Sequence, residues 1–422
     1  MKSRILTRTI LLVSFISLFT DVASEMLYPV MPVYLRSVGF SVLLIGILEG
    51  IAEAVAGLSK GYFGQFSDRM KQRVPFVRAG YIMSALSKPM MAVLTYPWWI
   101  FLARTIDRFG KGVRTGARDA ILSDETTPGN KGKVFGFHRG MDTIGAAIGP
   151  SLALVFLMFF PGHYKTLFYL AFFPGLFAIA LTFLLSEKNK PGISSAVGLT
   201  DNGIQASDSG KVPGKTQEEH RNTTGFLAYL KYWRLSAISF RYLVIGLLLF
   251  AVFNSSDAFL LLTIKDKHIS DTWMIALYIF YNLVYAALSF PLGALADKIG
   301  LKTMLISGLF LFAVVYLCFG FIASLTGFVV LFFFYGIYAA STEGISKALI
   351  SNLAGKSDTA TAIGFYTSFA SMFTLLSSTV AGLLWYTLGL KIMFIISGAG
   401  VLLAAIYLLI VSGKIRYVNS PA

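Results

Sequence analysis

Long apolar runs alternate with short polar turns along most of the chain. A helix that crosses a membrane needs ~20 mostly apolar residues, and twelve runs between charged or Pro/Gly-rich turns approach this length. The predicted spans are about 9–34, 42–66, 76–95, 97–123, 133–159, 166–185, 241–263, 271–295, 302–323, 326–352, 360–386 and 390–412. This pattern predicts an all-α membrane protein with twelve transmembrane helices.

One polar stretch divides this array into two sets of six spans. Residues 186–235 are rich in charged residues, Gly and Ser, which is typical of a mobile linker. We therefore predict an N-terminal six-helix half over 1–185, a cytoplasmic linker over 186–235 and a C-terminal six-helix half over 236–422. The linker is expected to end in a short surface helix near Tyr229–Trp233.

The two halves also repeat one another in sequence. A turn that contains Asp68 recurs around Asp297, 229 positions later, and Glu25 in the first span corresponds to Asp257 in the seventh, 232 positions later. Similar offsets in several spans indicate two parallel repeats related by an axis along the membrane normal.

Composition agrees with a lipid environment. The chain is 56% hydrophobic and only 14% charged, with a mean hydropathy of +0.70, so a soluble domain could not bury its apolar surface. The net charge of +15 is better explained by basic loops on the cytoplasmic side than by nucleic-acid binding. Both termini are therefore predicted in the cytoplasm, in a protein of the bacterial inner membrane.

Few residues suggest other chemistry. Cys318 is the single cysteine, and the four histidines are scattered without metal-ligand spacing. We expect no metal, no cofactor and no nucleic acid, a monomeric state, and no enzymatic activity, since no nucleophile–base pair appears. A membrane sensor is the alternative outside transport, although the polar linker is too short for a signalling domain.

Motifs in the chain resemble those of the major facilitator superfamily over essentially its whole length. The family's loop motif, G-x-L-A-D-[RK]-x-G-[RK]-[RK], is nearly complete in the second half, whereas Lys71 and Gln72 depart from it in the first. In the fourth-helix motif, R-x-x-x-G-x-G, Arg104 and Gly110 fit and Arg108 stands where Gly is usual. The loop residues that match are Gly64, Asp68, Arg69, Arg73, Gly293, Asp297, Lys298, Gly300 and Lys302.

A third motif, G-x8-G-x3-G-P-x2-G-G in the fifth helix, is partly present. Its matching residues are Gly136, Gly145, Gly149 and Pro150. In the family this motif marks proton-coupled exporters, and the segment Phe19–Pro29 is similar to a bacterial and archaeal exporter branch. The resemblance implies alternating access to a small-molecule site between two halves.

The loop motif has a physical interpretation. Asp68 can accept hydrogen bonds from the first amides of a neighbouring helix and pair with Arg69, Arg73 or a base of the other half, and Asp297 with Lys298 can act likewise. Such latches would hold the outward-open state and release as the halves rock. Alternatively, these charges only turn the chain and set topology. The Gly/Pro pattern of the fifth helix permits close helix approach and a bend, or plain packing.

Charged residues inside the spans are the main candidates for function, because such charges are costly in a membrane. Counting along each helix places several of them at similar depth, so acids of the first two helices are expected to pair with bases of the fourth. The predicted proton-coupling and substrate residues are Asp21, Glu25, Glu49, Glu53, Arg104, Asp107, Arg108, Lys111, Asp142, Asp257 and Asn282.

Three interpretations of these charges stay open. An acid such as Asp21, Glu25 or Glu53 could titrate while an Arg partner is released or engaged, which would make the pair a switch. The charges could instead form a static network, or the bases could bind an anionic substrate. In the C half, Glu343 and Lys347 are one turn apart and are expected to satisfy each other.

The sequence thus predicts a secondary transporter that moves a small organic solute by proton-coupled efflux. The alternatives within transport are uptake, or export of an anionic or metal-chelating metabolite such as a siderophore.

Overall fold

The computed structural model describes residues 6–28, 30–187 and 228–415, and this part of the chain contains helices and no strands. The N half consists of α1 (Arg8–Glu25), α2 (Met31–Ser37), α3 (Val42–Met70), α4 (Val74–Val93), α5 (Pro97–Asp124), α6 (Lys131–Phe159) and α7 (Tyr164–Thr182). The C half consists of α10 (Ile238–Phe253), α11 (Ala258–Asp266), α12 (Asp271–Ile299), α13 (Leu301–Phe319), α14 (Leu325–Leu353), α15 (Thr359–Leu388) and α16 (Leu390–Val411).

These helices form twelve crossing segments in the described part of the chain, because α1 with α2 and α10 with α11 are interrupted single segments. Eight segments are apolar enough to cross a membrane by composition alone. The other four, which begin with α1, α3, α4 and α5, all lie in the N half and carry charged side chains. The predicted twelve-helix, two-halved fold is therefore confirmed.

Two predicted spans are broken rather than continuous. The first is interrupted after Glu25, and the seventh is interrupted over Asn254–Asp257, just before α11. Glu25 and Asp257 are equivalent residues of the two repeats, so each repeat places a carboxylate beside its break. Polar groups at a break in a membrane helix are typical of sites that line an internal cavity.

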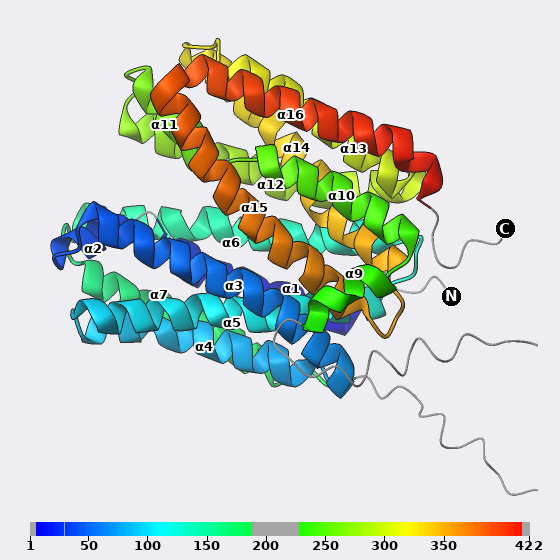
Figure 1. Ribbon diagram of the computed structural model, residues 1–422. Helices are drawn as coiled ribbons and strands as arrows, with labels where there is room; N and C mark the ends of the chain where they lie inside the picture. Colours follow the sequence, from blue (N-terminus) through cyan, green and yellow to red (C-terminus); the bar gives the residue numbers. More distant parts are fainter. Residues whose placement is uncertain (1–5, 29, 188–227, 416–422) are drawn as a thin grey trace, which may run out of the picture.

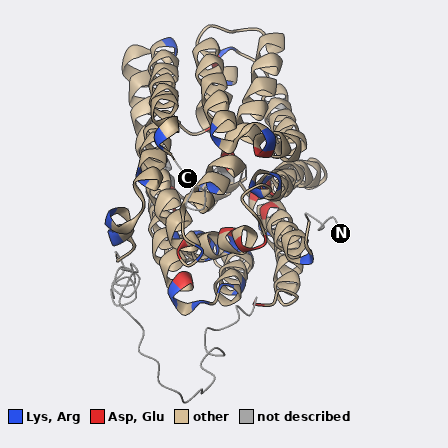
Figure 2. Cartoon of the chain, turned by 90° about the vertical axis from the view of Figure 1, so that its right-hand side faces the viewer, with Lys and Arg blue, Asp and Glu red and all other residues tan. Residues whose placement is uncertain are grey.

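The halves meet mainly along two helix pairs, α6 with α12 and α3 with α15, and α14 with α6 and α15 with α5 are in contact as well. In Figure 1 the two bundles lie side by side and approach each other at the right-hand end, where α1 begins and α16 ends. We call this the linker end, because Glu187 and Ala228, which flank the undescribed part of the linker, also lie there. Figure 2 looks onto this end.

Glycines permit the closest approach between the halves. A Cβ at Gly64 would collide with Ala360 O, and one at Gly293 would collide with Gly132 O. Every cross-half hydrogen bond and ion pair between described residues lies toward the linker end, from Lys60–Ser371 outward. The molecule is therefore closed at the linker end.

Most of the predicted linker, 188–227, lies outside the described residues. Its last part forms a short helical segment, η2 (Ala228–Lys231) and α9 (Tyr232–Leu235), close to the predicted position. This segment is not a simple surface helix. Tyr229 is 1% exposed, packs against Gly61 of the N half and shares a hydrogen bond of 3.1 Å with Ser368 of the C half.

Candidate functional site

A small charged cavity lies between α1 and α5. Its volume is about 20 Å³, which is room for a water molecule and far less than the ~300 Å³ of a drug-sized site. The sequence predicted similar depths for several of its residues, and the structure brings them together. The lining residues are Asp21, Ser24, Glu25, Tyr28, Arg104, Asp107, Arg108, Lys111 and Arg114.

Arg104 is the best-anchored base of this cavity. Its Nε and Nη2 each donate to a different oxygen of Glu49 on α3, both at 2.9 Å, and its Nη1 lies 3.4 Å from Asp107 Oδ2. A bidentate Arg–carboxylate pair fixes both orientation and distance. Arg108 lies more loosely, with Nη2 4.0 Å from Glu49 Oε2. Among the predicted pairs of second-helix acids with fourth-helix bases, Glu49 forms a close pair with Arg104 and a longer one with Arg108.

Asp107 has a partner that the sequence did not suggest. Lys88 Nζ on α4 donates to Asp107 Oδ1 at 2.6 Å, and the two side chains are 2% and 7% exposed. The lysine precedes Pro89 inside its helix, an interior charge without an obvious role in the sequence. The structure explains it as the counterion of a buried acid, a pairing that requires knowing how α4 packs on α5.

Three predicted acids do not form the expected pairs. Asp21, Glu25 and Glu53 make no hydrogen bond or ion pair with any described residue, and Lys111, which is exposed, makes none through its amine. The expectation that Asp21 and Glu53 pair directly with bases of the fourth helix is therefore wrong for this conformation. In this conformation the three carboxylates and the Lys111 amine therefore have no fixed partner among the described residues.

Glycines of α6 bring the first helix to this place. A Cβ at Gly145 would lie 2.6 Å from Leu18 O, and one at Gly149 would lie 2.7 Å from Val22 O, so α1 can approach only because both side chains are absent. Pro150 follows inside the helix and is buried. Gly136 has a different neighbour, since its close contacts are Ser289 and Gly293 of the other half.

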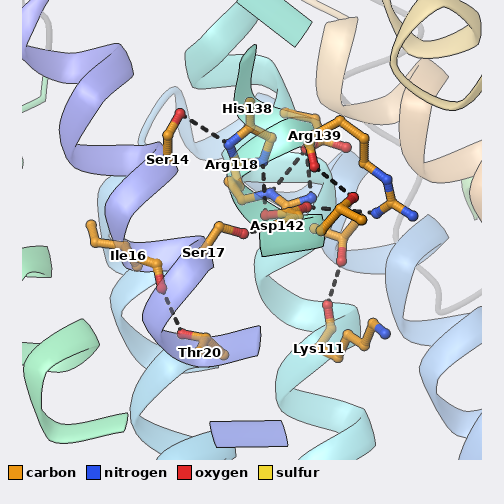
Figure 3. A network of polar contacts seen from close by, with 12 residues as sticks. Ser14, Ile16, Ser17, Thr20, Lys111, Arg118, His138, Arg139 and Asp142 are labelled. Carbon is orange, nitrogen blue, oxygen red and sulfur yellow. Dashed lines mark hydrogen bonds and ion pairs between the residues drawn. The ribbon is translucent and has the colours of Figure 1, made fainter. Parts of the chain in front are cut away.

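Asp142 lies in a second cluster rather than in the cavity, which corrects its predicted place. Its Oδ2 lies 3.6 Å from Arg139 Nη1 and 3.9 Å from Arg118 Nη1, and its Oδ1 lies 3.8 Å from His138 Nε2. Figure 3 shows Ser14 and Asp142 on either side of His138, whose Nδ1 lies 3.4 Å from Ser14 Oγ. This network links α1, α5 and α6.

The second cluster continues across the interface between the halves. Lys347 Nζ lies 2.8 Å from Asp119 Oδ2, and Glu343 Oε2 lies 3.9 Å from Arg139 Nη2. The prediction that Glu343 and Lys347 satisfy each other is therefore wrong in this state. Helix packing overrides local spacing here, because both side chains find partners in the N half.

The first loop motif makes contacts of the kind that the sequence predicted. Asp68 Oδ2 accepts hydrogen bonds from the amide and hydroxyl of Thr361, at 2.7 and 2.9 Å, in the first turn of α15. Its Oδ1 lies 3.3 Å from Arg73 Nη2. Arg73 also pairs with Asp124 at 2.5 Å and donates to Lys356 O. Arg69 is half-buried nearby.

The second loop motif repeats this arrangement in a simpler form. Asp297 accepts from the amides of Gly132 and Lys133, at 2.8 and 2.9 Å, at the start of α6. The basic residues take no part in this contact, since Lys298 is exposed and Lys302 donates to carbonyls at the end of the C half. Among the loop-motif residues of the second half that the structure describes, Asp297 alone hydrogen-bonds to the start of α6.

Three residues after each motif aspartate, Asp68 and Asp297, the chain turns through a residue with a positive φ. Gly300 has φ +101°, and Lys71, which replaces glycine in the first motif, has φ +52°. A lysine in this region is strained relative to glycine. The departure from the motif therefore changes the residue and keeps the sign of the backbone angle.

Two predicted site residues of the C half, Asp257 and Asn282, have neutral hydrogen-bond partners. Asp257 accepts a hydrogen bond of 2.7 Å from the hydroxyl of Tyr335, and Asn282 donates to Tyr278 O on its own helix. Tyr335 belongs to a cluster of rings with Tyr281 and Tyr338, at centroid separations of 5.0 and 5.2 Å. An aromatic interior thus stands where the N half has ion pairs.

Sequence reasoning overlooked one cross-half contact of α3. Lys60 Nζ donates to Ser371 Oγ of α15 at 2.7 Å. The only signal for it was a basic residue four positions before the motif glycine Gly64.

Comparisons with known proteins agree with this architecture. A family model described as Major Facilitator Superfamily matches residues 13–281 and 259–421. An uncharacterized MFS-type transporter of Methanocaldococcus jannaschii is 30% identical over 387 residues, which cover 91% of this chain and 90% of that protein. The multidrug resistance protein MdtH of Sodalis glossinidius is 25% identical over 119 residues, 28% of this chain and 29% of that protein.

A solved structure has the same fold. The crystal structure of the human organic anion transporter MFSD10 superposes with a TM-score of 0.73 at 17% identity, covering 95% of this chain and 99% of that one. Fold and charged interior define a multi-pass membrane transporter built of two halves. The chain belongs to the Major Facilitator Superfamily, a family of transporters rather than enzymes.

Proposed function

We propose that this protein exports a small organic solute in exchange for protons. The observation that carries the proposal is the set of three interior carboxylates, Asp21, Glu25 and Glu53, which have no ion-pair partner among the described residues, beside the well-paired Glu49 and Asp107. An interior acid without a fixed partner is free to bind and release a proton during a cycle.

The proposed cycle is alternating access by rocking of the two halves. The linker end faces the cytoplasm, because the basic loop residues Arg73, Lys131 and Lys302 lie there. The structure is then the outward-facing state, and Asp68 and Asp297 act as latches that hold it. Efflux, rather than uptake, is supported by the fifth-helix motif and by the partial similarity to a protein named for multidrug resistance.

A second candidate is transport of an anionic or metal-chelating metabolite. It is favoured by Lys111, which is exposed beside the cavity and has no acidic partner among the described residues. In this case the base would bind the substrate's negative charge, and replacing it would weaken substrate binding without removing proton movement.

Proteoliposomes that contain a pH-sensitive dye test both proposals. Solutes chosen by a thermal-shift screen are added, and a substrate is recognised because it dissipates an imposed pH gradient. Asp21→Asn, Glu25→Gln and Glu53→Gln should each be compared with Asp266→Asn, an exposed carboxylate at the opposite end of the molecule. We expect at least one interior variant to lose proton movement and stay folded. Undiminished proton movement in all three would reject the proton role.

A further inference from the structure

Helix α14 presents two opposite charges to the N half, one helical turn apart. Lys347 Nζ lies 2.8 Å from Asp119 Oδ2, and Glu343 Oε2 lies 3.9 Å from Arg139 Nη2. Residues four apart on a helix are also within reach of each other. Glu343 and Lys347 therefore have an alternative partner on their own helix, which they do not use in the closed state.

Each N-half partner also has a second partner in its own half. Asp119 Oδ1 accepts hydrogen bonds from Arg118, whose Nη2 lies 2.9 Å away, and Arg139 Nη1 lies 3.6 Å from Asp142 Oδ2. The set thus contains three acids and three bases. It can be divided into Arg118–Asp119 and Arg139–Asp142 on one side of the interface, and Glu343–Lys347 on the other.

This double set of partners matters because Asp119 is fully buried, with a side-chain exposure of 0%. Breaking a buried ion pair is strongly unfavourable when it leaves one charge alone. Here the halves can separate without stranding any of the six charges. The motif aspartates Asp68 and Asp297 differ, since the amides that they bind across the interface belong to the first turn of a helix and carry no side-chain charge.

We propose that Glu343 and Lys347 form a partner-exchange switch. They bind Arg139 and Asp119 while the linker end is closed, and they bind each other when it opens. Other polar groups that face the switch include His138, which lies near Asp142, and the Tyr285 hydroxyl, which accepts from Arg139 Nε. They also include Ser17, which accepts from Arg118, and Lys60 and Tyr366, which lie within electrostatic range of Lys347 and Glu343. The proposal rests on alternating access and names residues that set the balance between the closed and the open state.

The exchange predicts an effect opposite to that of an ordinary gate. In Glu343→Gln the closed state loses a contact of 3.9 Å, and Lys347 keeps Asp119. The open state, in contrast, leaves Lys347 without a partner. The substitution should therefore favour the closed state, whereas a simple cross-half lock would be weakened and would open.

Spin labels on the two sides of the linker end measure this balance. The native Cys318 is replaced by Ser, and labels are attached at Lys71→Cys and Lys356→Cys, two exposed residues of opposite halves. Distance distributions are recorded by pulsed electron paramagnetic resonance in lipid nanodiscs, at acidic and alkaline pH. We expect Glu343→Gln to lower the long-distance population by up to about twofold, consistent with the loss of one helical ion pair.

The reversed pair Glu343→Lys/Lys347→Glu should act in the other direction. It keeps the contact within α14 but sets the new positive charge against Arg139 and the new negative charge against Asp119, so the long-distance population should rise. Asp266→Lys/Lys267→Asp reverses an exposed pair at the opposite end and serves as the control, with no expected shift.

The outcomes separate this inference from the proposed function. If the unmodified protein shows two distances but Glu343→Gln raises the long one or leaves it unchanged, the exchange is wrong and alternating access stands. A single short distance under every condition would contradict the rocking itself, and the switch with it.

Discussion

The two halves share a backbone plan but differ in how their interiors satisfy polar groups. In the N half, Glu49 with Arg104 and Lys88 with Asp107 form ion pairs at 2.9 and 2.6 Å, and the second pair is buried. In the C half, the equivalent region holds tyrosine rings, and Asp257 accepts from the Tyr335 hydroxyl. The two repeats share the close glycine contacts between the halves and the hydrogen bonds of Asp68 and Asp297 to a helix start. The polar groups of their interiors differ.

This difference assigns separate tasks to the halves under the proposed function. Ion pairs can exchange partners and take up protons, so the N half suits ion coupling. A cluster of aromatic side chains offers apolar faces with hydroxyl edges, so the C half suits an organic solute. Substitutions that change one type of contact at a time test whether the two halves differ in this way.

The largest expected effect follows from stranding a charge in the N half. Asp107→Asn leaves Lys88 buried without its counterion, and the free energy of unfolding should fall by ~3–5 kcal/mol. The double variant Lys88→Met/Asp107→Asn should recover part of this loss, because no charge is then stranded. Unfolding of the purified protein in mixed detergent micelles, with increasing SDS, measures both. Equal losses in single and double variants would contradict the ion-pair explanation.

A somewhat smaller effect is expected where the halves are alike, at the interface glycines. Gly64→Ala and Gly293→Ala each place a methyl group against a carbonyl of the other half. Overpacking of ~1–3 kcal/mol should shift the spin-label distances toward the open state by about tenfold. Gly50→Ala on the same helix as Gly64 meets nothing within 4 Å and is the control. If both interface variants kept the short spin-label distance of the closed state, the helices would have moved enough to accept the methyl group.

The sequence could predict the features that both repeats share, but it could not predict the partner of each interior charge. The contacts of Asp68 and Asp297 with helix amides were predictable, since a duplicated acid at a helix end points to the first amides of a neighbouring helix. That these amides belong to the other half was not predicted. Lys88–Asp107 was not, because the pairing depends on which faces of α4 and α5 meet. Local spacing even misled for Glu343 and Lys347, whose one-turn separation suggested a pair that the closed interface replaces.

The contacts of Asp68 and Asp297 should differ from each other in free energy by less than the interior contacts of the two halves do. Asp68 accepts from the amide and hydroxyl of Thr361 and pairs with Arg73, whereas Asp297 accepts from two amides and forms no ion pair with a described residue. Hydrogen bonds to a charged group contribute ~1.5–3 kcal/mol. Asp68→Asn should therefore open the linker end more than Asp297→Asn in the same spin-label measurement. The reverse order would mean that Arg73 does not support its latch.

The smallest effect is expected in the aromatic interior of the C half. Tyr335→Phe removes one hydrogen bond to Asp257 and leaves the ring packing unchanged. The free energy of unfolding should fall by only ~1.5 kcal/mol, the lower end of the range for a hydrogen bond to a carboxylate, because the Tyr281 hydroxyl also interacts with this acid. Tyr386→Phe, at a ring that is 89% exposed, should change nothing and is the matched control. The same detergent titration applies. A loss as large as that of Asp107→Asn would mean that the C-half carboxylate depends on the Tyr335 hydroxyl as strongly as the N-half acids depend on their basic partners. The contrast between the halves would then lie in residue type rather than in energetics.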